Sequence, residues 1–240
     1  MPIEISEAPQ IAAAPAQADW QRLAAVIDHT LLKPESPNIK VQQLCREALE
    51  YGFACVMLNP TNVALACSLL AGTGVEVGSV VGFPFGANTT SVKRYEALDA
   101  IRLGAHELDM VMNIGALKSG DRAMVQADMR GLVEIAHGNG AILKITIETA
   151  LLSLEEKILA CQLAVAAGAD LVKSSTGFFH AGAVPADISL MRGVVGDKLG
   201  VKASGGIRTF EDAQAMIEAG ANRIGTSSGV AIVESARAKS

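Results

Sequence analysis

The stretch LEEKILACQLAVAAGADLVKSS, residues 154–175, contains in one piece the pattern that decides the fold. Residues 154–167 have a long helical pattern, and Gly168 follows them as a helix stop. Residues 171–175 then form a short apolar run, which is typical of a buried strand. From Trp20 onward the same rhythm of short apolar run, turn and longer helical pattern repeats along the chain. This alternation with short connections predicts a parallel sheet.

Eight such runs are present, and eight strand–helix repeats predict one (β/α)8 TIM barrel, with an open doubly wound sheet as the alternative. The predicted strands are Val26–Thr30, Ala54–Asn59, Val77–Gly82, His106–Asn113, Ile142–Glu148, Leu171–Ser175, Val201–Ser204 and Arg223–Ser227. The predicted helices include Val41–Tyr51, Asn62–Ala71, Ser91–Leu103, Ala123–His137, Leu154–Ala167, Ala186–Val195 and Phe210–Ala219. Since active groups of such barrels lie at the carboxyl ends of the strands, we expect the chemistry there.

The composition limits the function classes. Residues 1–18, rich in Ala, Pro and Gln, are expected to form a flexible tail or short N-terminal extension, and residues 19–240 a single barrel domain. A net charge of −5 without basic clusters argues against nucleic acid or an anionic membrane as partner. No apolar run approaches the ~20 residues of a membrane helix. Four cysteines without metal-ligand spacing indicate reduced thiols, so we expect a cytoplasmic protein.

Two lysines interrupt neighbouring apolar strands. Lys173 shares a strand face with Leu171 and Ser175, and Lys202 occupies an equivalent setting in GVKASGG, residues 200–206. A lysine at a strand end whose ammonium reaches solvent is the alternative for Lys173 taken alone. Because neighbouring strands are ~5 Å apart, two such lysines lower one another's pKa, which makes an amine nucleophilic near neutral pH. The pair therefore indicates Schiff-base chemistry, with Lys173 or Lys202 as the nucleophile.

Carboxylates are expected at a matching depth in the barrel. Asp109 lies within HELDMVMN, residues 106–113, and Asp28 within VIDHT, residues 26–30. Together with the two lysines, they supply balanced charge and a proton donor and acceptor. A purely structural ion pair is the alternative role for each aspartate. Lys144 and Glu148, on one face of the fifth strand, are expected to form a supporting pair.

Two loops rich in glycine and hydroxyl groups predict a phosphate site. They are residues 204–206, which include Gly205 and Gly206, and residues 225–229, which include Ser227 and Ser228. Barrels often bind phosphate after their seventh and eighth strands, through backbone N–H groups and a helix N-terminus. Residues 175–177 are positioned to close the same pocket. The histidines show no metal-ligand spacing and no nucleotide-binding glycine motif is present, so we expect neither a metal nor a dinucleotide cofactor.

These motifs together resemble the deoxyribose-phosphate aldolase family, over about residues 22–233. The stretches that carry the resemblance are IDHTLLKPE, GFACVMLNP, VVGFPFGANTT, ELDMVMNIGALKSG, LKITIETALL, LVKSSTGF, VKASGGIRT and RIGTSSG. The resemblance implies a (β/α)8 barrel and a metal-free class I aldolase. It also implies reversible cleavage of 2-deoxy-D-ribose 5-phosphate to D-glyceraldehyde 3-phosphate and acetaldehyde, in deoxyribonucleotide catabolism.

The resemblance assigns a role to each matching residue. Lys173 is implied as the Schiff-base lysine, Lys202 as the neighbour that lowers its pKa, and Asp109 as the proton donor and acceptor through an ordered water. Asp28 is implied to tune Lys202. The implied phosphate ligands are Gly205, Gly206, Ser227 and Ser228, and the implied sugar contacts are Thr176 and Gly177. The expected partners are small sugar phosphates and aldehydes, and further copies of the chain in a dimer or tetramer.

Two departures from the family pattern stand out. Met57 occupies a position where the family often has cysteine, which predicts better tolerance of reactive aldehydes, and the chain's last residues carry no tyrosine for proton exchange. The alternatives are another Schiff-base sugar-phosphate aldolase, a metal-free sugar-phosphate isomerase and a non-catalytic sugar-phosphate-binding barrel. Reductive trapping on a lysine separates the aldolases from the other two.

Overall fold

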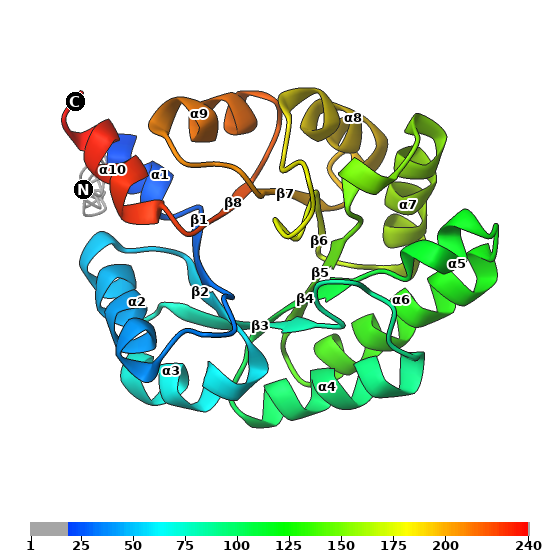
Figure 1. Cartoon of the computed structure of the whole chain (residues 1–240), viewed down its shortest axis with the longest axis horizontal. Coiled ribbons are helices and arrows are strands. Elements are labelled where there is room, and N and C mark those ends of the chain that lie inside the picture. Colours follow the sequence, from blue (N-terminus) through cyan, green and yellow to red (C-terminus); the bar gives the residue numbers. More distant parts are fainter. Residues whose placement is uncertain (1–18, 240) are drawn as a thin grey trace, which may run out of the picture.

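The structure, a computed structural model, describes residues 19–239 and is a closed barrel of eight parallel strands surrounded by helices (Figure 1). The expected tail over residues 1–18 lies outside the described residues. The strands run in sequence order around the barrel, and β1 pairs with both β2 and β8, which closes the ring. The predicted (β/α)8 fold is therefore confirmed, and the open sheet is excluded. The strands are β1 Ile27–Leu31, β2 Cys55–Leu58, β3 Glu76–Val81, β4 Glu107–Val111, β5 Ile142–Thr146, β6 Leu171–Lys173, β7 Gly200–Ser204 and β8 Arg223–Thr226.

The helices cover the outside of the barrel, and each predicted helix is present (Figure 1). Sequence analysis did not predict α1, α5 or α10. The helices are α1 Asp19–Ala24, α2 Asn38–Tyr51, α3 Val63–Leu70, α4 Thr90–Arg102, α5 Ile114–Lys118, α6 Arg122–Gly138, α7 Leu154–Ala167, α8 Pro185–Val195, α9 Phe210–Glu218 and α10 Gly229–Arg237. Short 3-10 turns span Pro60–Asn62 and Thr149–Leu151.

Local sequence signals explain where α7 begins and ends. Ser153 caps its first turn in a capping box with Glu156, which satisfies amide groups at the helix start. Gly168 ends the helix with φ 80°, a left-handed conformation that costs glycine little. The chain can then turn directly into β6. This abrupt reversal places Lys173 at the carboxyl end of its strand.

The main apolar core lies between the sheet and the helices, because the outward faces of the strands pack against apolar helix faces. A second, small cluster of Leu32, Cys55, Met57 and Val80 lies inside the barrel. Much of the remaining barrel interior is occupied by charged side chains. Among the described helices, none combines the length and apolar character required to cross a membrane.

Candidate active site inside the barrel

Seven ionisable side chains from six strands form one connected ion-pair network among the described residues. Six of them are buried, and Arg223 is partly exposed. Residues two apart on a strand share a face, so Glu107 and Asp109 both point inward from β4. Closure of the ring then brings β1, with Asp28, beside β8. The members of this interior network are Asp28, Glu107, Asp109, Lys144, Lys173, Lys202 and Arg223.

Asp109 joins the two predicted lysines of the network, Lys173 and Lys202. Its Oδ2 accepts hydrogen bonds from Lys173 Nζ at 2.7 Å and from Lys202 Nζ at 2.8 Å. Lys173 and Lys202 are register partners on the paired strands β6 and β7, as the strand pattern predicted. Lys202 also forms an ion pair with Asp28. The four residues predicted to be catalytic are thus linked by direct ion pairs, with Asp28 joined to the others through Lys202.

Lys144 has a different environment from the one predicted. Its Nζ lies 3.0 Å from Asp109 Oδ1 and 3.3 Å from Asp28 Oδ2, and it also pairs with Glu107. The expected pairing with Glu148 is wrong, because Glu148 turns into a left-handed conformation with φ 57° just beyond the strand. Its Oε2 instead accepts hydrogen bonds from the backbone N–H and hydroxyl of Thr176, at 2.8 and 2.6 Å. Glu148 therefore holds the loop after β6.

The network perturbs the ionisation of its members in opposite directions. Burial, together with the neighbouring ammonium groups of Lys202 and Lys144, lowers the pKa of Lys173 to about 8 despite its bond to Asp109. Burial also disfavours the ionised form of Asp109, but three lysines outweigh it and keep the pKa of this carboxyl well below its usual range. Three carboxylates likewise raise the pKa of Lys144 despite its burial. Lys173 is the member whose neutral amine becomes available near neutral pH.

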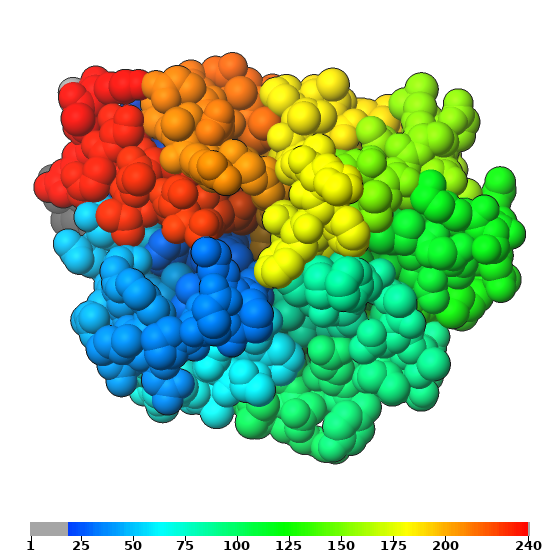
Figure 2. Space-filling model, in the orientation of Figure 1, coloured from blue at the N-terminus to red at the C-terminus, as the bar shows by residue number. Residues whose placement is uncertain are grey.

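A cavity of about 410 Å³ opens above Lys173 at the carboxyl ends of the strands. Besides Lys173, five of the six predicted substrate-binding residues line it: Thr176, Gly177, Gly205, Gly206 and Ser227. Ser228 is not among its lining residues; the Ser228 backbone N–H donates to Thr226 Oγ1 at 2.9 Å. Figure 2 shows the yellow connection between β6 and α8 extending over the centre of this face, beside blue and orange segments.

The charged residues that line the cavity, within the described part of the chain, are all cationic. They are Lys33, Lys173 and Arg208. Sequence analysis selected neither Lys33 nor Arg208, although both lie in loops that follow strands, in HTLLKP and SGGIRT. A cavity with positive side chains, backbone N–H groups and glycine-rich loops favours an anionic ligand.

The comparisons with known proteins agree with this geometry. Residues 22–235 match the family model of the DeoC/LacD family aldolases. The chain belongs to this aldolase family. It is 56% identical over 218 residues to a deoxyribose-phosphate aldolase of Geobacillus sp. (strain WCH70), covering 91% of this chain and 97% of that protein. It is 57% identical to a protein of the same name from Thermococcus gammatolerans, covering 90% and 96%.

Solved structures support the same assignment of this aldolase-family chain. The tetrameric deoxyribose phosphate aldolase from Aeropyrum pernix superimposes with a TM-score of 0.86 at 37% identity. That match covers 92% of this chain and 94% of the other. The family assignment therefore rests on sequence and on three-dimensional structure.

Gly205 lies in this aldolase-family chain where two loops of the cavity approach each other too closely for a side chain. Gly205 has φ 90°, and a Cβ there would lie 3.0 Å from Gly182 Cα and 3.1 Å from Ser175 Oγ. The backbone after β7 therefore packs directly against the connection that follows β6. An L side chain at this position would push the two loops apart. Glycine here brings the cavity walls from β6 and β7 together.

Aromatic side chains cover Lys173 on the side of β3. Phe83, in the loop after β3, packs edge to face against Phe178 from the loop after β6, with ring centroids 5.1 Å apart at 88°. Lys173 Nζ lies 5.9 Å from the Phe83 ring centroid. The two rings bring the β3 and β6 loops together and add apolar surface next to the amine, which supports its desolvation.

Met57, the residue that departs from the aldolase family's pattern, lies inside the barrel. Met57 is fully buried in the small interior cluster with Cys55, and it does not line the cavity. Cys55 is also fully buried, and burial raises the pKa of its thiol well above the usual range. Neither position presents an exposed thiolate to the cavity. The expected aldehyde tolerance stays a prediction, which we treat below.

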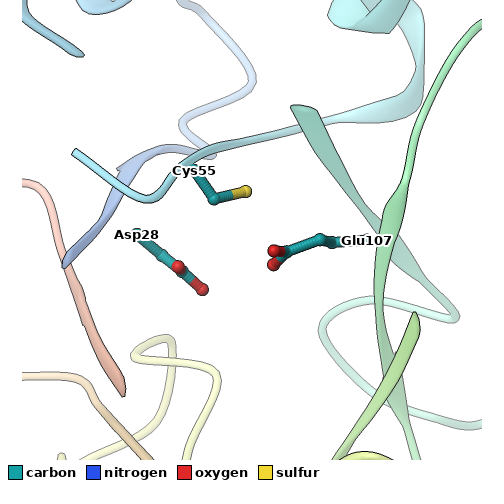
Figure 3. Close-up of side chains that lie close together, drawn as sticks. All are labelled: Asp28, Cys55 and Glu107. Carbon is teal, nitrogen blue, oxygen red and sulfur yellow. The ribbon is translucent and has the colours of Figure 1, made fainter. Parts of the chain in front are cut away.

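Among residues 19–239 of this aldolase-family chain, one group of side chains has donor atoms close enough to surround a metal ion. Asp28, Cys55 and Glu107 each place a ligand atom within 4.8 Å of the others (Figure 3). Both carboxylates already form ion pairs with Lys144 and Arg223, and the thiol is held in its neutral form. A metal ion would compete with two fixed positive charges. The trio therefore fits the ion-pair network better than a metal centre.

Proposed function

We propose that this chain cleaves 2-deoxy-D-ribose 5-phosphate reversibly to D-glyceraldehyde 3-phosphate and acetaldehyde, in deoxyribonucleotide catabolism, through a Schiff base on Lys173. The observation that carries the proposal is the position of Lys173, the one member of the interior network that lines the cavity within residues 19–239. Its lowered pKa supplies a neutral amine at the floor of a site that favours anions. The names of relatives at 56% and 57% identity support this substrate.

Lys173 acts first as the nucleophile and then as the electron sink. Its neutral amine adds to the C1 aldehyde, and loss of water gives an iminium. Asp109, acting through a water molecule, accepts the proton of the C3 hydroxyl as that oxygen becomes the carbonyl of glyceraldehyde phosphate. The electrons of the broken C2–C3 bond pass to the nitrogen and leave an enamine. Protonation at C2, followed by hydrolysis of the resulting iminium, releases acetaldehyde and restores the lysine.

Lys202 and Asp28 support these proton transfers. Lys202 shares Asp109 Oδ2 with Lys173, so a proton can pass within this group without entering bulk water. Asp28 holds Lys202 through a direct ion pair. We assign proton carriage to the pair of Asp109 and Lys202, and the positioning of Lys202 to Asp28.

The loops after β6, β7 and β8 hold the substrate in this proposal. We assign the phosphate to the backbone of Gly205 and Gly206 and to Ser227, with Arg208 adding positive charge at the rim. Thr176 and Gly177 contact the sugar. We also assign Ser228, the residue before α10, to the phosphate through its hydroxyl, because its backbone N–H is bonded to Thr226 Oγ1.

The proposed chemistry needs no metal or organic cofactor, since the imine nitrogen itself accepts the electrons of the broken bond. The proposed partners are a sugar phosphate, an aldehyde and further copies of this chain, in a cytoplasmic homo-oligomer. The tetramer formed by the Aeropyrum pernix relative supports an oligomer of this kind.

Borohydride reduction in the presence of acetaldehyde tests the proposal. We expect an ethyl group on Lys173 by peptide mass mapping, and none at this position in Lys173→Leu. Cleavage of 2-deoxy-D-ribose 5-phosphate, followed through the glyceraldehyde phosphate formed, should vanish in the same variant. A folded parent protein without an adduct would overturn the mechanism. An adduct on Lys202 alone would exchange the roles of the two lysines.

A further inference from the structure

The interior network contains unequal numbers of acidic and basic groups. Three carboxylates face three lysines and one arginine within the described residues. With every basic group protonated, the buried network would carry one uncompensated positive charge. Such a charge is costly in a buried site, and arginine does not lose its proton in proteins. One lysine is therefore the member that becomes neutral.

The number of carboxylate partners identifies that lysine. Within residues 19–239, Lys144 pairs with three carboxylates, Lys202 with two and Lys173 with one. Lys173 also shares its single carboxylate, Asp109, with both other lysines. The least compensated ammonium loses its proton first. The charge balance of the whole network thus selects the lysine that lines the cavity.

Two members of the network, Glu107 and Arg223, lie outside the cavity lining. Glu107 is the first residue of β4 and Arg223 the first residue of β8, so both lie toward the amino ends of their strands. Arg223 Nη2 donates to both carboxylate oxygens of Glu107, each at 2.9 Å, and its Nε donates to Asp28 Oδ1 at 2.7 Å. Neither residue lines the cavity. Their charges nevertheless belong to the same connected network as Lys173.

We propose that Glu107 and Arg223 are positioning residues that set the protonation state of Lys173 from outside the cavity. Arg223 supplies the permanent positive charge that makes one lysine surplus. Glu107 holds Lys144 in its charged form and fixes the position of the Arg223 guanidinium. The inference rests on the proposed function of Lys173 as the Schiff-base nucleophile.

The other groups that face Lys173 define what the test must keep constant. Asp109 and Lys202 are in direct or shared contact, and Lys144, Asp28 and Cys55 lie one step further within the barrel. The Phe83 ring faces the amine from the β3 loop, and Lys33 and Arg208 line the same cavity. All of them remain unchanged in the variants below.

The test measures how fast Lys173 is ethylated by acetaldehyde and borohydride between pH 6 and 10. Four variants are compared with the parent: Arg223→Gln, Glu107→Gln, the Arg223→Gln/Glu107→Gln double variant and Arg223→Lys. Peptides that contain exposed lysines serve as internal controls in each sample. The same variants are assayed for the pH dependence of kcat/KM in sugar-phosphate cleavage.

We expect the two single variants to shift the pH midpoint of Lys173 ethylation in opposite directions. Strands β6 and β8 flank β7, so the backbone positions of Lys173 and Arg223 are about 10 Å apart. One charge at that distance changes the ratio of neutral to protonated amine about tenfold. Arg223→Gln should raise the midpoint by about one pH unit, and Glu107→Gln, which removes a negative charge from the same network, should lower it. The double variant and Arg223→Lys should both return close to the parent.

A merely structural role predicts a different result. Both single variants would then lose rate without a shift in midpoint, and the double variant would be at least as impaired as either single variant. Shifts of the same sign, or none in variants that keep the parental melting temperature, overturn the inference. If the parent itself shows no ethylation of Lys173, the proposed function fails instead. The two failures are therefore distinguishable.

Discussion

Replacing Lys202 by methionine tests how much one neighbouring charge contributes to the reactivity of Lys173. The two ammonium nitrogens contact the same oxygen of Asp109, at 2.7 and 2.8 Å, so they are no more than about 5.5 Å apart. Two unit charges at that distance repel by about 3 kcal/mol at an effective dielectric constant of about 20. That energy corresponds to about two pH units. Lys202→Met removes this repulsion and leaves Asp109 Oδ2 to Lys173, while Lys144 stays paired with Asp109 Oδ1.

The sign of the effect follows from the lowered pKa of Lys173. Its ammonium loses the proton around pH 8, so about a tenth of the amine is neutral at pH 7. In Lys202→Met the ammonium is favoured, and the neutral fraction at pH 7 should fall about a hundredfold. Ethylation of Lys173 at pH 7 should slow by the same factor and should approach the parental rate above about pH 10. Quantitative peptide mass spectrometry after timed borohydride trapping measures both rates.

The pH dependence distinguishes this electrostatic effect from a displaced lysine. A displaced Lys173 would react slowly at every pH, whereas a more basic one recovers in alkali. Lys198→Met, a change on the exposed surface, is the matched control and should leave the profile unchanged. Ethylation of Lys202→Met within threefold of the parent at pH 7 would refute the reasoning.

Three further changes probe other parts of the molecule. Lys93→Met leaves Asp128 charged and unpaired in a buried site, so the free energy of unfolding measured in urea should fall by about 3–5 kcal/mol. Adding Asp128→Leu should recover most of that loss, and a fall below about 1 kcal/mol contradicts the assigned pair. Arg208→Gln should raise KM about tenfold for the phosphorylated sugar and leave unphosphorylated 2-deoxyribose unaffected, whereas equal effects on both sugars would remove Arg208 from the phosphate site. Met57→Cys restores the residue that the family often has here, so it should speed inactivation by concentrated acetaldehyde, measured as residual activity; equal rates would disprove the expected tolerance.

Much of the fold was predictable because each repeat carries its own local signals. The helical pattern of residues 154–167, with Gly168 after it, marks a helix end and a strand start without information from elsewhere in the chain. Strand ends were predicted less well. The run His106–Asn113 ends as a strand at Val111, because Asn113 caps α5 by accepting a hydrogen bond from the Ala116 backbone N–H. Such a cap depends on where the chain turns next.

The contacts of the site also divide into those that local sequence predicts and those that depend on the closed barrel. The pairing of Lys173 with Lys202 follows from two consecutive repeats of equal depth, so the sequence pattern was sufficient to expect it. The contact between Arg223 and Asp28 joins residues 195 positions apart and exists only because β8 closes on β1. Glu107 was overlooked although period 2 places it on the same strand face as Asp109. That spacing was a usable signal.

Ring closure also explains why the reactive lysine is not decided by its own strand. Lys173 and Lys202 have similar apolar neighbours along the chain, and sequence reasoning from the residues alone left the choice between them open. The difference is the number of carboxylates that each ammonium meets, and those carboxylates come from β1 and β4. Buried ion pairs are often no more stabilising than apolar packing of similar volume. An interior with seven ionisable groups is therefore better explained by the proton it removes from Lys173 than by any gain in stability.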